Sequence, residues 1–472
     1  MTTKPYFSDE QEPSEVSELG NLTNGQRLVN PILLFFYLLS FYVSLAFPWN
    51  TKSDAIFGVK IGGYVLEPQL LLILGLLVPL YFLLRPRFQS PALRRILITC
   101  WVFTIIGGLY FAVSVFLMES RHGGKSYAIV MPMIDLKSWF LLWMMPMTAL
   151  YIYDRGFDRW LLHFLIATAC YCAFVLVIRA MPYGFGSKFI VTGEWEAEGF
   201  GFLGRITMRN DRLLILAIPL AVAWILDRGF SLFPVICLCL YLAQMTNSQG
   251  RTHMAFIVVI TAIILIRNRR LGRTAVVLAI AVFVVSVTLL TIPEHQKFGL
   301  TVRLSNLGEQ TRAYLSMLHA SNMIALEQIR GNFFKILFGV GFGTILDLYG
   351  GIDTPILYFV DNLWVTLLLK IGIIGTTIIG GIIIYLCWGT ARGRAVSNID
   401  RTFKLWAFFM PFLCLRSSFL LWSAVSGVIW TTLAAGAVLA EERQFANTEQ
   451  FLDTDEYAAG ESIAHLEEQT PV

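Results

Sequence analysis

Eight arginines lie in alternate segments between the long apolar runs of this sequence, where they can act together on an anion. A guanidinium group is planar and permanently charged, and it can bind a phosphate group through two parallel hydrogen bonds. The set therefore predicts an anion-binding site, although each arginine taken singly can also pair with a nearby carboxylate or lipid phosphate. The eight residues are Arg179, Arg205, Arg209, Arg212, Arg251, Arg303, Arg312 and Arg330.

Three of these arginines come from three separate segments and can converge on one ligand. Arg205 precedes one apolar run, Arg251 stands at the entrance of another, and Arg312 opens an amphipathic stretch. We expect these three to hold a diphosphate group. Arg209 and Asn210 follow Arg205 closely and are further candidates for binding the same substrate.

A proton acceptor would complete such a site, and Asp361 is the leading candidate. It stands with Asn362 where a long polar segment re-enters an apolar run, and a partly desolvated carboxylate can accept a hydroxyl proton. Asp361 can instead cap the following helix, because Asp and Asn favour that position. His319 lies seven residues after Arg312, on the same helical face, which can equally be a solvated face. Other candidates are His253, Glu309, Asp211, Glu194, Glu196 and Glu198.

The elements that must position these residues are apolar helices. Only 14% of the 472 residues are charged and the mean hydropathy is +0.65, whereas soluble domains carry about 25% charged residues. Because a backbone in lipid must satisfy its own hydrogen bonds, the apolar runs predict an all-α bundle of about twelve membrane spans. The runs are 31–48, 66–84, 96–117, 134–153, 160–180, 213–227, 230–246, 252–266, 274–292, 362–388, 403–421 and 423–440.

Every even-to-odd connection between these runs is basic, which places those connections and both termini in the cytoplasm. Their residues are Arg85, Arg87, Arg94, Arg95, Arg155, Arg159, Arg228, Arg267, Arg269, Arg270, Arg273, Arg392, Arg394, Arg401 and Lys404. The eight arginines of the predicted anion site are therefore expected to face outward, against the usual trend. This excess of outward arginine supports a site for an anion.

The chain divides into five parts. Residues 1–28 and 441–472 are polar and carry net charges of −3 and −8, so 29–440 carries +15. We expect both tails to be disordered and cytoplasmic. Residues 29–292 hold spans one to nine, 293–361 form a large, partly helical outer loop, and 362–440 hold spans ten to twelve. Outer loops of this length are usually functional.

The region 30–440 resembles the O-antigen polymerase and O-antigen ligase superfamily of membrane glycosyltransferases (Wzy/WaaL type). The shared features are the span number, the cytoplasmic ends, the large loop after span nine and the order of several short motifs. The motifs are Arg205 to Asn210, Ser248 to Arg251, Arg312, Gly339-Val340-Gly341-Phe342-Gly343, Asp361-Asn362, and Gly372 or Gly375. Ligases of the superfamily carry His where this chain has Asp361, so the resemblance favours a polymerase.

The resemblance implies a polymerase of polyprenyl-diphosphate-linked oligosaccharide repeat units for O-antigen, capsule or exopolysaccharide, at the outer face of the bacterial cytoplasmic (inner) membrane. Arg251, Arg312 and Asp361 would be catalytic. Arg205, Arg209, Asn210, His319 and Asn362 would bind substrate. No metal or cofactor is expected, because arginines would neutralise the leaving diphosphate. Expected partners are the lipid-linked oligosaccharides, the bilayer, a flippase and a chain-length regulator, but not nucleic acid.

Three alternatives remain open at this stage. One is an O-antigen ligase acting on a lipid or protein acceptor. Another is a transporter or flippase of the same lipid-linked sugars, which would bury charges within its spans; the charged residues of this kind are Asp135, Lys137, Lys370 and Arg416. The third, a metal-dependent enzyme using polyprenyl monophosphate, needs an acidic pair in the first outer loop, which offers only Asp54.

Overall fold

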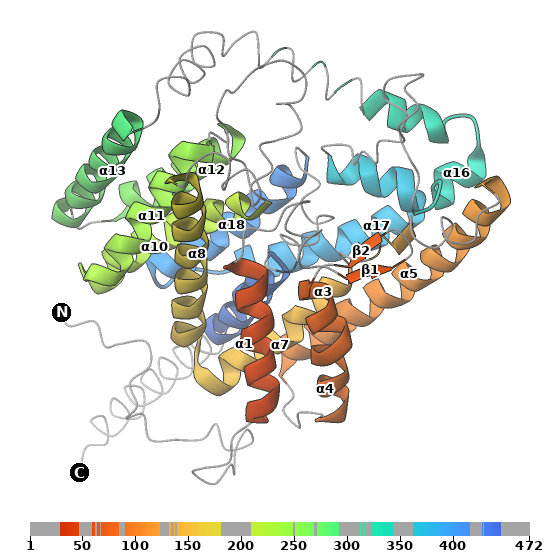
Figure 1. Ribbon diagram of the computed structural model, residues 1–472, viewed down its shortest axis with the longest axis horizontal. Helices are drawn as coiled ribbons and strands as arrows, with labels where there is room; N and C mark the ends of the chain where they lie inside the picture. The colour runs from red at the N-terminus through yellow and green to blue at the C-terminus, as the bar shows by residue number, and fades with distance from the viewer. Residues whose placement is uncertain are drawn as a thin grey trace, which may run out of the picture.

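The chain is described by a computed structural model (Figure 1). The residues that the structure describes are 29–46, 59–61, 64–66, 68–84, 90–122, 132–133, 136, 139–180, 209–248, 251–268, 271–291, 312, 316, 319, 322–342, 362–415, 427 and 429–444. Asp361 and Arg205 lie outside them.

Four helices are long and apolar enough to cross a membrane, as expected for a multi-pass membrane protein. They are α5 (Pro91–His122), α8 (Phe157–Ala180), α13 (Leu271–Thr291) and α17 (Leu363–Ala391). Most of the other described helices are apolar but shorter. They are α1 (Pro31–Leu45), α3 (Pro68–Leu72), α4 (Val78–Leu83), α7 (Met144–Arg155), α10 (Leu214–Arg228), α11 (Leu232–Ser248), α12 (Arg251–Arg267), α16 (Phe333–Phe338), α18 (Asn398–Cys414), and the unlabelled helices 322–329 and 429–444.

Short helical turns of other kinds join some of these helices. A π-helix, η1 (Ile73–Leu77), links α3 to α4, and two 3-10 turns, η2 (Leu141–Trp143) and η4 (Arg209–Leu213), lead into α7 and α10. The predicted span 66–84 is therefore three successive helical pieces.

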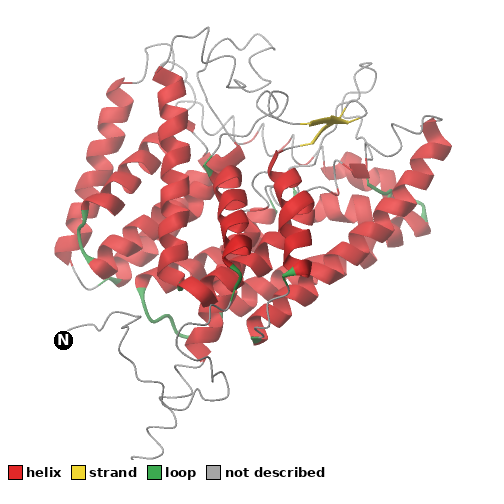
Figure 2. Cartoon of the chain, turned by 60° about the horizontal axis from the view of Figure 1, so that its bottom comes forward, coloured by secondary structure: helices red, strands yellow, loops and turns green. Residues whose placement is uncertain are grey.

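A small hairpin departs from the all-α prediction. Strand β1 (Val59–Ile61) pairs antiparallel with β2 (Tyr64–Leu66), with Val59 opposite Leu66. Figure 2 shows the hairpin at one margin of a molecule otherwise drawn as helices. β-Branched residues favour strands, and the Gly62-Gly63 pair between the two strands suits a two-residue hairpin turn.

Helix α13 lies at the edge of the molecule (Figure 1), whereas α10 is surrounded by other helices. α10 packs against α8, α11, α12 and α18, and twelve of its residues are buried. Only 11% of the apolar window of α13 is buried. A helix that is apolar all round and buried on one side only faces lipid elsewhere, so α13 has the surface of a peripheral span.

Aromatic rings fill the core where α1, α8 and α18 meet. Trp160 stacks on Phe164 with ring centroids 5.6 Å apart, and it also contacts Phe403 of α18 and Phe41 of α1. These rings are almost wholly buried. Large, close-packed aromatic side chains contribute much of the packing contact of a core, so this cluster fixes how the three helices sit together.

The connections with the basic pattern lie together on one face of the bundle, which we call the basic face. It is formed by the ends of helices at residues 90–95, 153–160, 226–232, 267–268, 271–273, 390–401 and 439–444. Bonds join these segments in pairs: Val29 with Asp154, Ala92 and Tyr153 with Glu441, Asp158 with Arg228, Leu226 with Arg273, Asp227 with Asn398, and Arg392 with Arg443. The alternation read from the sequence is thus matched by one shared face.

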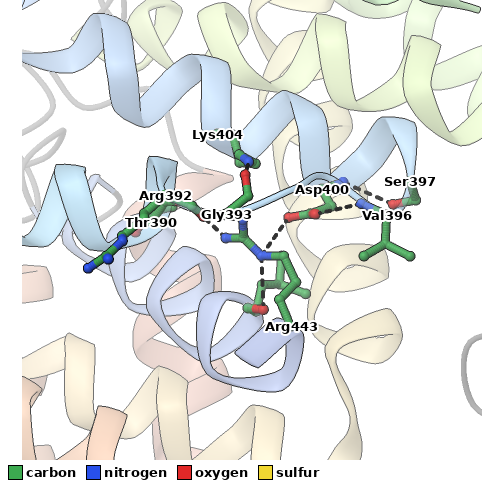
Figure 3. A network of polar contacts seen from close by, with 9 residues as sticks. Thr390, Arg392, Gly393, Val396, Ser397, Asp400, Lys404 and Arg443 are labelled. Carbon is green, nitrogen blue, oxygen red and sulfur yellow. Dashed lines mark hydrogen bonds and ion pairs between the residues drawn. The ribbon is translucent and has the colours of Figure 1, made fainter. Parts of the chain in front are cut away.

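Arg443 is the centre of a network of polar contacts on the basic face (Figure 3). Its Nη1 donates to the carbonyl oxygen of Arg392 (2.8 Å) and its Nη2 to that of Thr390 (2.7 Å), while Nε lies 3.3 Å from Oδ1 of Asp400. Asp400 also accepts a hydrogen bond from the backbone N–H of Val396 (3.1 Å). Because the last carbonyls of a helix lack partners within it, Arg443 closes the end of α17 and ties it to the start of α18.

Helix α17 is broken near its other end, at Gly372. This residue has φ 64° and ψ −172° inside a segment that is otherwise helical. The break frees carbonyl groups of the preceding turn, and a loop from the chain before α17 takes them up. The N–H of Val340 donates to the carbonyl oxygen of Leu369 (2.7 Å), and that of Gly341 donates to Lys370 (3.0 Å).

The loop that fills the break begins with glycines for a steric reason. Gly339 and Gly341 have φ of 78° and 101°, a region that other residues rarely adopt. A Cβ on Gly339 would lie 2.5 Å from the carbonyl oxygen of Lys370. The Gly-x-Gly motif singled out from the sequence is thus a docking loop against α17.

Candidate functional site

A buried carboxylate marks the end of the bundle opposite the basic face. Asp211 in η4 is 1% exposed, and its Oδ1 accepts hydrogen bonds from the Tyr171 hydroxyl (2.7 Å) and the Gln244 amide (2.8 Å). The donors come from α8 and α11. Burying a carboxylate is costly unless it is well hydrogen-bonded, and these two bonds hold Asp211 in place between three elements.

The segments around Asp211 carry three of the predicted substrate residues. Arg209 and Asn210 are the first two residues of η4, and Arg251 is the first residue of α12. η4 packs against α10 and α11, and α12 packs against α10. The backbone therefore brings these residues to the same end of the bundle, although their side chains lie outside the described part of the structure.

Asn362 reaches the same end through α17. Because α10, α12 and α17 each end at the basic face, their first residues lie opposite it, and α18 packs against all three. Trp364 of α17 donates from Nε1 to the carbonyl oxygen of Pro411 in α18 (3.3 Å). The starts of these three helices thus surround the far end of α18.

Asn362 acts as a helix cap in this position. Its Oδ1 accepts from the backbone N–H groups of Trp364 (3.1 Å) and Val365 (3.3 Å), and its side chain is largely buried. The structure thus gives the capping role to Asn362. Both capping bonds use Oδ1, so the side-chain amide nitrogen of Asn362 takes no part in them. Asp361 lies outside the described residues, so its own role stays a prediction.

Arg312 and His319 stand apart from this arrangement. Both side chains are exposed. Among the described residues, no hydrogen bond or ion pair joins either side chain to the Asp211 cluster. Their meeting with Arg251 at one ligand stays a prediction.

Two polar residues of the site were missed from the sequence, and one was undervalued. Tyr171 and Gln244 lie within apolar runs, where a polar side chain must find a partner; that placement is the signal that could have identified them. Asp211 was considered only as one of several proton acceptors. Lys370, noted as a charge within a span, is 5% exposed and lies beside the break in α17.

The described side chains include no group of three His, Cys, Asp or Glu residues placed to hold a metal ion. Comparison with protein-family models, curated proteins and solved structures returned no match to this chain.

Proposed function

We propose that this chain is a twelve-span glycosyltransferase that polymerises polyprenyl-diphosphate-linked oligosaccharide units at the outer face of the bacterial cytoplasmic membrane. The observation that carries the proposal is the shared position of Arg209, Asn210 and Arg251 beside the buried Asp211, at the end of the bundle opposite the basic face. By the positive-inside rule the basic face meets the cytoplasm, so these residues meet the outer leaflet. A lipid diphosphate presents its head group at that level.

In the proposed reaction, a sugar hydroxyl of one lipid-linked unit attacks the anomeric carbon of another. The new glycosidic bond forms as the bond from that carbon to the diphosphate oxygen breaks, and polyprenyl diphosphate leaves. Asp361 accepts or orients the hydroxyl proton. Arg205, Arg251 and Arg312 stabilise the negative charge that develops on the diphosphate, and Arg209, Asn210, His319 and Asn362 bind the sugars or the head group.

The cluster around Asp211 has a positioning role in this scheme. The hydrogen bonds from Tyr171 and Gln244 tie η4 to α8 and α11. Arg209 and Asn210 are therefore part of a helical turn that is held in a fixed position. Fixed charges stabilise a transition state better than mobile ones because they need no reorganisation during the reaction.

A transporter of the same lipid-linked sugars is the second candidate. The buried Lys370 beside a broken helix favours it, since charges within spans and interrupted helices are typical of transport pathways. The two candidates differ in their products: a polymerase makes longer chains from purified units, whereas a transporter only moves the units across the bilayer.

The decisive assay incubates purified protein in proteoliposomes with lipid-linked repeat units and EDTA, and it measures the length of the sugar chains. We expect polymer to form without added metal, and we expect the double variant Arg251→Ala with Arg312→Ala to lose it. Arg394→Ala is the matched control, because Arg394 is an exposed arginine on the basic face. A need for divalent metal, or full activity in the double variant, would contradict the proposal.

A further inference from the structure

Helix α16 exposes its three phenylalanine side chains. None of its six residues is buried, and Phe333, Phe334 and Phe338 are 69%, 72% and 49% exposed. Three exposed phenylalanines on one short helix form an apolar patch of the kind that marks an interaction surface. The nature of the partner follows from where α16 lies relative to the bilayer.

Helix α17 gives the first measure of that position. Its break at Gly372 separates a part without exposed residues from a part with an exposed apolar stripe. The stripe consists of Ile373, Ile374, Ile378, Ile384, Tyr385 and Trp388. From the break to Thr390, which Arg443 binds at the basic face, the helix rises by about 27 Å. This is close to the roughly 30 Å of a hydrocarbon core.

Helix α5 gives a second measure from the same reference level. The N–H of Ala92 bonds to Glu441 at the basic face, and eighteen residues further along the helix the Tyr110 hydroxyl donates to the carbonyl oxygen of Ile371 (2.7 Å). These two points are also about 27 Å apart along the helix. The outward surface of α5 is apolar throughout, from Ile98 to Phe116.

The loop that follows α16 fixes the helix at this level. Gly339, the C-cap of α16, is followed by Val340 and Gly341, which bond to α17 just before the break. The N–H of Phe342 then donates to Oγ of Ser114 on α5 (2.6 Å). α16 therefore lies about one hydrocarbon thickness from the basic face, at the edge of the molecule in Figure 1.

We infer that α16 is an interfacial membrane anchor, whose phenylalanines insert into the outer leaflet at the boundary between acyl chains and head groups. The exposed patch continues the lipid-facing surfaces of α5 and α17 at the level where both measures place the end of the hydrocarbon core. Aromatic side chains favour that boundary. Lys335, which is half-buried, can extend its amino group from the same helix toward lipid phosphates.

The anchor would hold the outer loop against the bilayer. Helix 322–329 packs Ala325 and Ile329 onto Val340 and Leu369, so it is joined to the same docking loop. The segment that carries Arg312 and His319 leads directly into that helix. The inference concerns the membrane position of the loop and holds whether or not the proposed reaction is correct.

The test is a nitroxide placed at Phe334→Cys in proteoliposomes of phosphatidylethanolamine and phosphatidylglycerol. Its collisions are compared with oxygen, which concentrates in the acyl region, and with a water-soluble nickel chelate. Val113→Cys on the apolar face of α5 is the lipid-facing control, and Arg330→Cys, on an exposed residue near α16, is the aqueous control. Wild-type protein treated with the same label gives the background from its own thiols.

We expect the label at Phe334 to behave like that at Val113, with oxygen access several-fold above nickel access, and the label at Arg330 to show the reverse. Nickel access at Phe334 equal to that at Arg330 would overturn the inference. So would a label shielded from both reagents, because the patch would then be covered by protein; recovery of oxygen access on dilution with lipid would identify the cover as a second copy of the chain.

Discussion

Tyr110 of α5 donates its hydroxyl hydrogen bond to the carbonyl oxygen of Ile371 (2.7 Å), the residue immediately before the break in α17. The two residues are 261 positions apart in the sequence. The bond satisfies a carbonyl that the interrupted helix cannot pair within itself. It also connects α5 directly to the point where the loop with Val340 and Gly341 docks.

The first prediction is that Tyr110→Phe destabilises the protein by about 1–3 kcal/mol, since the Ile371 carbonyl would lose its donor. A lower apparent unfolding temperature in detergent micelles would show this. Tyr385→Phe is the control, because Tyr385 is 56% exposed on the lipid-facing side of α17. Equal unfolding temperatures for the two variants would contradict the role given to this bond.

The second prediction concerns the glycine at the break itself. A Cβ on Gly372 would overlap the carbonyl oxygen of Leu337 and the backbone nitrogen of Gly339, and its positive φ alone disfavours alanine by about 1–2 kcal/mol. We expect Gly372→Ala to lower the unfolding temperature clearly. Gly381 lies in the same helix with no atom within 4 Å of an added Cβ, so Gly381→Ala should be neutral or stabilising by up to about 1 kcal/mol. The reverse order would be inconsistent with the docked loop.

These features show how far the sequence could go. Hydropathy and charge predicted helix starts at Arg251 and after Asn362, because a helix start depends on the residues next to it. The break at Gly372 was not predicted, because Gly372 lies within the apolar run 362–388, which reads as one helix. Its conformation depends on Gly339 and Gly341, about thirty residues earlier. The hydropathy pattern of one segment cannot predict a contact with a residue so far away in the sequence.

The site shows the same division. The sequence identified Arg209, Asn210 and Asn362 as polar residues at helix starts, and the structure brings their backbone to one end of the bundle. It could not pair Asp211 with Tyr171 and Gln244, because three different helices must pack before these side chains meet. The hairpin at 59–66 was missed for another reason: the Gly62-Gly63 pair that separates the two strands in the sequence was overlooked as a turn signal.

The third prediction tests the buried carboxylate of the site. Tyr171→Phe removes one of the hydrogen bonds to Asp211, and a bond to a charged group contributes about 1.5–3 kcal/mol. We expect reduced thermal stability and, if the proposed polymerase activity is correct, shorter sugar chains. Tyr385→Phe again serves as the matched control. A Tyr171→Phe variant with unchanged stability would show that Tyr171 does not support the carboxylate.

The fourth prediction concerns Arg443 on the basic face. Arg443→Met would leave Asp400 buried without its cation and two carbonyl groups without donors (Figure 3), which costs roughly 3–5 kcal/mol. The double variant Arg443→Met with Asp400→Asn should recover part of the loss, because no buried charge remains. Arg394→Met, at an exposed position, is the control. Equal losses in the single and double variants would argue against the ion pair.

The fifth prediction is a pH dependence that arises at Glu442, beyond the end of the last predicted span. Burial, together with the nearby charges of Glu441, Asp158 and Asp400, raises the pKa of Glu442 to about 7. The folded protein therefore keeps a proton that the unfolded chain, with an ordinary pKa near 4.5, has already released. Stability from this group is complete below pH 4.5 and declines as the pH rises to about 7.

Glu442→Gln should remove this decline, because glutamine does not titrate. The measurement is the apparent unfolding temperature of both proteins in detergent between pH 4.5 and 7.5. A smaller slope should persist in the variant, since burial also raises the pKa of Asp400, and adding Asp400→Asn should flatten it. Parallel curves for wild type and Glu442→Gln, or a wild-type stability that increases over this range, would show that Glu442 is already ionised in the folded protein and that the basic face reaches water at this point.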